Sequence, residues 1–67
     1  MKVSLASQIA EIDRELEQRR QVYPRLRASG KMRPSIAEIQ VKHLEAVRET
    51  LTWLRENERA IKQRLAP

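Results

Sequence analysis

Two long stretches of this chain repeat apolar residues in alternating steps of four and three, and a short segment with Gly and Pro separates them. This spacing places a stripe of side chains along one face of an α-helix, the face that packs against another helix. The sequence therefore predicts an all-α fold, an antiparallel two-helix hairpin forming one domain over residues 1–67. The first stripe comprises Leu5, Ile9, Ile12, Leu16, Arg19, Tyr23 and Leu26, and the second Gln40, Leu44, Val47, Leu51, Leu54, Glu58, Ile61 and Leu65.

The first helix is predicted over about residues 4–29, with Ser4 or Ser7 as its N-cap. Pro24 falls inside this range, and a proline removes one backbone hydrogen bond and crowds the preceding turn. Because the apolar stripe continues past Pro24 in the same phase, we expect a kinked helix. The alternative is a break into a short third helix at about residues 24–29.

The turn is predicted over residues 30–34, and the second helix over about 35–64. Gly30 suits the left-handed conformation that ends many helices. Ser35 and Glu38 have the spacing of a capping box, in which the serine hydroxyl caps the helix and the glutamate reaches back. Folding the chain at this turn pairs Leu26 with Ala37, Leu16 with Val47, and Ile12 with Leu51.

The chain is too small to build a large core alone, and it has no cysteine that could form a disulfide. We therefore expect a homodimer that forms a four-helix bundle. An exposed Trp beside apolar neighbours is typical of a contact surface. The predicted protein interface comprises Val22, Ile39, Val41 and Trp53. The alternatives are a monomeric hairpin, or a fragment whose partner is another, unidentified protein.

Positive charge gathers in the middle of the chain. The segment from Gln18 to Ala37 has no Asp or Glu, while the remaining residues carry eight Lys and Arg against nine acidic residues, and the net charge is +5. Such a segment attracts phosphate, so a nucleic-acid surface is the alternative function, although no known nucleic-acid-binding motif accompanies it. The other interpretation is a solvated positive end. The basic residues are Arg19, Arg20, Arg25, Arg27, Lys31 and Arg33.

No arrangement of residues points to catalysis. His43 has no carboxylate three or four residues further on, and the acidic pairs of the first helix lack the Glu-x-x-His pattern of metal-binding bundles. We expect no enzyme activity, no cofactor and no metal. The sequence also shows no signal peptide and no membrane-spanning apolar run, so a cytoplasmic protein without membrane association is expected.

Several segments of the chain resemble small open reading frames of tailed phages and prophages. The resemblance implies a bacterial host cytoplasm and a phage-related role, and it transfers no catalytic residue. The sequence thus predicts a small phage-type accessory protein acting as a protein-interaction or assembly module. The segments that carry the resemblance are Glu11-Ile12-Asp13-Arg14-Glu15, Arg20-Gln21-Val22-Tyr23-Pro24-Arg25-Leu26, Ala28-Ser29-Gly30-Lys31-Met32 and Val47-Arg48-Glu49-Thr50-Leu51-Thr52-Trp53-Leu54.

Overall fold

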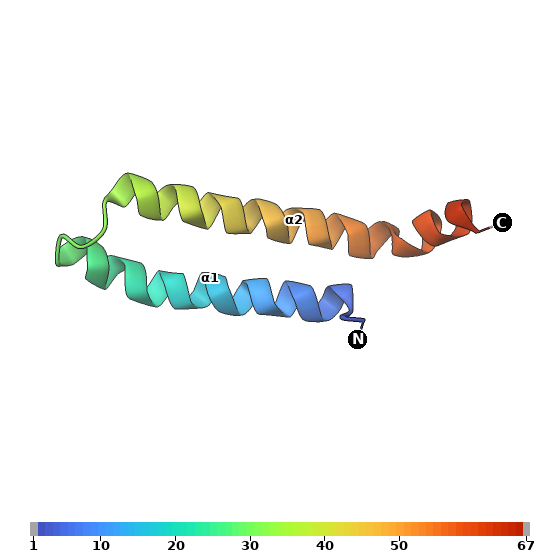
Figure 1. Ribbon diagram of the computed structural model, residues 1–67, viewed down its shortest axis with the longest axis horizontal. Coiled ribbons are helices and arrows are strands. Elements are labelled where there is room, and N and C mark those ends of the chain that lie inside the picture. Colours follow the sequence, from blue (N-terminus) through green and yellow to red (C-terminus); the bar gives the residue numbers. More distant parts are fainter. Residues whose placement is uncertain (1, 67) are drawn as a thin grey trace.

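The computed structural model describes residues 2–66, which form two long helices joined by a short turn (Figure 1). Helix α1 spans Leu5–Ala28 and helix α2 spans Pro34–Leu65. The helices lie side by side and antiparallel in a rod of 56 × 21 × 17 Å. The predicted all-α hairpin is confirmed, and each helix boundary lies within one residue of its predicted place.

Helix α1 begins where the sequence predicts and continues without a break through Pro24. The hydroxyl of Ser4 accepts a hydrogen bond of 3.1 Å from the backbone N–H of Ser7, so Ser4 is the N-cap. Pro24 lies only four residues before the end of the helix at Ala28, where the loss of one N–H donor removes little of the helical ladder. The alternative of a separate third helix after Pro24 is wrong.

The turn ends α1 with a Schellman motif. The N–H of Lys31 donates to the carbonyl of Leu26 at 2.9 Å, and the N–H of Gly30 donates to the carbonyl of Arg27 at 3.1 Å. Gly30 has φ of +75°, a conformation that a residue with a Cβ adopts at a cost. The predicted role of Gly30 is confirmed.

Helix α2 begins differently from the prediction. Arg33, in extended conformation, is its N-cap, and Pro34 is its first residue. The capping box predicted at Ser35 and Glu38 is wrong, because no side chain caps this helix and Ser35 lies inside its first turn. The reason is Pro34, which favours an extended residue before it and fits the first helical position, so the helix begins one residue early.

The seam between the helices follows the predicted stripe on α1 and much of the predicted stripe on α2, where Leu44, Leu51, Leu54, Glu58 and Ile61 are half-buried. Ile9 and Leu16 of α1 are buried, and Ala37 is the most buried residue of α2. On α2 the residues toward α1 are Ala37, Val41, Leu44, Arg48 and Leu51, a set that we call the seam residues. Val47, which the sequence pairs with the buried Leu16, is 44% exposed.

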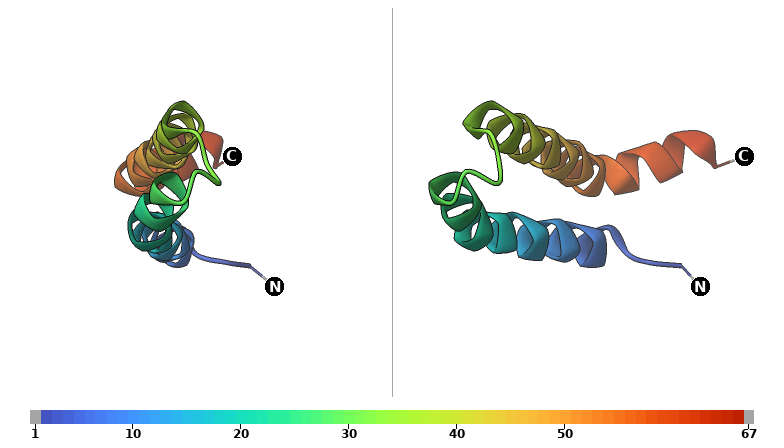
Figure 2. Two further views of the ribbon diagram at one scale, coloured as in Figure 1. Left: turned by 90° about the vertical axis from the view of Figure 1, so that its left-hand side faces the viewer. Right: turned by 60° about the vertical axis from the view of Figure 1, so that its left-hand side comes forward.

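The hairpin is a single layer of helices with a thin core (Figure 2). Ile9, Leu16 and Ala37 are the buried apolar residues in the part of the chain that the structure describes. Helix α2 has 32 residues against 24 in α1, so its C-terminal end extends beyond the start of α1 (Figure 1). This end carries Leu65, which is 79% exposed.

Candidate functional site

Helix α2 carries a second apolar stripe beside the seam, which we call the α2 strip. Toward the turn, its members each precede a seam residue by one position. Toward the C-terminus, its members continue the same spacing. Ile36 and Val47 are exposed, as is Leu65, while Leu54 and Ile61 are half-buried. The strip consists of Ile36, His43, Val47, Thr50, Leu54, Ile61 and Leu65. Gln40 has the same spacing, but its side chain is directed to α1 by the hydrogen bond from Tyr23.

The α2 strip and the seam face different directions. Consecutive residues of an α-helix are about 100° apart around its axis. Because Ile36 precedes Ala37 and Val47 precedes Arg48, the strip is turned by about this angle from the seam. A helix in a four-helix bundle contacts two adjacent neighbours at roughly right angles, so it needs two stripes placed in this way. Helix α1 occupies one of the two. The other is open at Ile36, Val47 and Leu65 and partly covered at Leu54 and Ile61.

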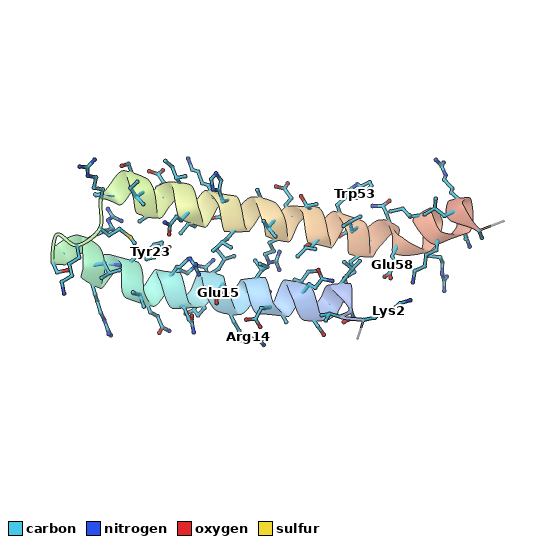
Figure 3. The ribbon with its side chains drawn as sticks, viewed as in Figure 1. Lys2, Arg14, Glu15, Tyr23, Trp53 and Glu58 are labelled. Carbon is cyan, nitrogen blue, oxygen red and sulfur yellow. The ribbon has the colours of Figure 1, made fainter. Side chains whose placement is uncertain are left out.

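The four residues predicted as an interface do not form one surface. Val41 is half-buried toward α1, and it lines a groove with Tyr23 and Pro24. Val22 is exposed on α1. Trp53 is an exposed residue of α2 at the outer border of a groove shared with α1 (Figure 3). Ile39, two heptads earlier, lies about 40° from it around the helix. The sequence pattern already places Val47, Leu54, Ile61 and Leu65 in the predicted stripe of the second helix, but as part of the seam and not as a separate surface.

Trp53 borders a groove between the helices that is rich in charged residues. Asp13 and Glu17 line it from α1, and Arg48 and Glu49 line it from α2. Arg48 crosses the groove and donates to Asp13 at 2.5 Å. This ion pair is about half exposed and ties the two helices together on the side opposite the α2 strip.

A string of polar side chains occupies the seam toward its turn end. Arg19, at an apolar position of the α1 stripe, pairs with Glu15, and the hydroxyl of Tyr23 donates to Gln40. Figure 3 shows Tyr23 between the helices. The hydrogen bond that Arg19 donates to Glu15 raises the pKa of the Arg19 guanidinium, and burial acts in the opposite direction. The Nε atom of Arg19 is buried without a hydrogen-bond partner in the described residues, so this arginine is not fully satisfied in the seam.

The structure brings the six predicted basic residues to the turn end of the rod but divides them into two groups. Arg19 and Arg20 pair with acidic residues one turn earlier in α1, at 3.5 Å for Arg20 and Glu17. The other four form no ion pair within residues 2–66. Two of the four lie in the last turn of α1, where cations also interact favourably with the helix dipole. We call these four residues the basic end: Arg25, Arg27, Lys31 and Arg33.

Among residues 2–66, no group of three or more His, Asp or Glu side chains lies close enough together to hold a metal ion. Neither helix of this part of the chain combines the length and the apolar character that crossing a membrane requires. Comparison of the chain with models of protein families, with curated proteins and with solved structures finds no match.

Proposed function

We propose that this protein is a non-enzymatic interaction or assembly module that works as a homodimer, with the α2 strip as its interface. The observation that carries the proposal is the pair of stripes on α2, of which the hairpin covers one. Two hairpins packed through the open stripe form a four-helix bundle. Trp53 and Ile39 lie outside this interface, which differs from the set predicted from the sequence.

The exposed area of the hairpin supports the proposal. The chain exposes 5869 Å². A compact monomer of 7.9 kDa is expected to expose about 4,400 Å². The excess of about 1,500 Å² is nearly twice the ~800 Å² that each partner buries in a typical stable interface. A second copy therefore has enough surface to cover, and covering it supplies the core that one hairpin lacks.

A phage or prophage role for this module rests on the resemblance of its sequence segments. Compact helical dimers suit accessory roles in which one protein holds another, because their outer faces stay free. Trp53 and the neighbouring groove are one such outer face, available to a further protein partner.

Static light scattering of the full chain tests the proposal. It is made at low and high salt, with and without a short DNA duplex. A mass twice that of one chain at both salts, unchanged by the duplex, supports the assembly module. A mass of one chain at all concentrations contradicts it.

A second candidate function is binding of nucleic acid through the basic end. Its support is that these four cations have no ion-pair partner in the described residues, so their charge is available to phosphate. The test compares Arg25→Glu with Arg33→Glu against Arg59→Glu with Arg64→Glu, a pair with the same change in net charge at the opposite end of the rod. Salt-sensitive duplex binding that only the first pair abolishes supports this function. Binding that both pairs weaken equally, or no binding by the unmodified chain, contradicts it.

A further inference from the structure

We infer that the second copy packs on the α2 strip in one orientation, with the two α2 helices antiparallel, the two turns at opposite ends, and the two-fold axis passing between Thr50 and Leu51. This inference rests on the proposed function, since it specifies the partner and the register of the same surface. Its support is the distribution of apolar residues, helix length and charge along α2.

Four of the five apolar members of the strip are arranged symmetrically about the middle of α2, and the fifth, Ile61, meets Gln40 of the other copy. With the axis between Thr50 and Leu51, Val47 of one copy meets Leu54 of the other, and Ile36 meets Leu65. Each pair joins two apolar side chains across the interface. An interface between identical copies needs such self-complementarity, because every contact occurs twice.

The unequal helix lengths have an explanation in this arrangement. The last residues of α2 extend beyond the start of α1 (Figure 1), and Leu65 is 79% exposed there. In the antiparallel dimer this end reaches the start of α2 in the second copy, where Ile36 is 46% exposed. The two most distant members of the strip thus cover each other, at both ends of the bundle.

Charge selects the same orientation. The basic end carries four cations without ion-pair partners in the described residues. If the two turns lay together, eight such cations would crowd one end of the bundle and repel each other. With the turns at opposite ends, the two basic ends are separated by most of the 56 Å length of the rod, well beyond the roughly 8 Å over which charges interact at physiological salt.

Cysteine cross-linking tests the arrangement, because the chain has no cysteine of its own. Thr50→Cys places a thiol beside the two-fold axis, where it meets its own copy. The control is Ala46→Cys, one turn earlier. Its two thiols are separated by about nine residue steps along the bundle, or about 13 Å at 1.5 Å per residue. A disulfide cannot span this distance. Two further single variants, Val47→Cys and Leu54→Cys, are mixed after one of them is given a tag that changes its size on a gel. Ile36→Cys and Leu65→Cys are mixed in the same way.

We expect Thr50→Cys to form a covalent dimer under mild oxidation and Ala46→Cys to remain largely monomeric on a non-reducing gel. We expect the mixed samples to give mainly the product of intermediate size, which joins two different variants. Self-linked Ile36→Cys would overturn the orientation, because it requires the turns to lie together. A mass of two chains by light scattering without these cross-links would overturn the arrangement and leave the proposed function standing. A mass of one chain would overturn both.

Discussion

Replacing Val47 with glutamate tests whether the α2 strip is the interface. Val47 lies near the centre of the strip and is 44% exposed in the hairpin, so a glutamate there is compatible with the hairpin itself. In the dimer the same position is covered by the second copy. The substitution removes about 1 kcal/mol of apolar burial per copy. It adds at least about 1 kcal/mol for covering a carboxylate without a partner.

The two-fold symmetry doubles this effect. Each dimer contains two substituted positions, so the total is about 4 kcal/mol, which corresponds to a roughly thousandfold higher Kd. Sedimentation velocity over a concentration series measures the Kd, and circular dichroism follows the helix content. Because the hairpin core is thin, loss of helix that accompanies dissociation agrees with the same account.

The matched control is Ala60→Glu, which introduces the same charge at an exposed position of α2 that has no member of the strip three or four residues away. It leaves the strip intact, so its Kd is expected to stay close to that of the unmodified chain. The reasoning is refuted if Val47→Glu assembles as well as the unmodified chain, or if both substitutions weaken assembly equally.

Three further predictions concern other parts of the hairpin. Trp53→Ala is expected to change the Kd of the dimer by less than about threefold, because the indole lies outside the interface. Acrylamide quenching of Trp53 fluorescence should likewise be the same in dilute and concentrated samples. Weaker quenching in the concentrated sample would place Trp53 in the interface. Arg19→Leu is expected to stabilise the protein by about 1 kcal/mol in urea unfolding, because it replaces a guanidinium that is not fully hydrogen-bonded in an apolar seam. A loss of stability would show that the ion pair with Glu15 is net favourable. Gly30→Ala is expected to lower the free energy of unfolding by about 1 kcal/mol, because residue 30 has a φ of +75°. A Cβ there meets no atom within 4 Å, so the cost comes from the backbone conformation alone. Gly30→Asn should lower the free energy of unfolding by less, and an equal loss for both variants would contradict this reason.

The sequence predicted the hairpin well because its determinants are local. Ser4 caps its own helix, Gly30 ends α1, and the four-three repeat of α1 needs only one partner helix to be interpreted. The start of α2 was harder to predict because two local signals compete there. The capping pattern at Ser35 and the proline before it favour different starting points, and the fixed φ of Pro34 prevails.

The interface was harder to predict from sequence because α2 has two overlapping repeats. Leu44 and Leu51 fit a stripe with Val47 and Leu54, and they fit equally well a stripe with Val41 and the stem of an arginine. A rule that favours apolar residues chooses the first stripe. The structure uses parts of both: Ala37 is buried and Val41 half-buried near the turn, while Leu54 and Ile61 of the first stripe are half-buried further along α2. The sequence pattern alone does not separate the covered residues of α2 from the open ones.

Thermal unfolding at different protein concentrations is the most direct test that a second copy completes the core. The measurement follows helix content by circular dichroism over about a hundredfold range of concentration, because assembly that accompanies folding makes the Tm depend on concentration. The dimer predicts a Tm that rises by several degrees from the most dilute to the most concentrated sample. A Tm that is the same at every concentration would show that the hairpin is stable alone, and would contradict the account.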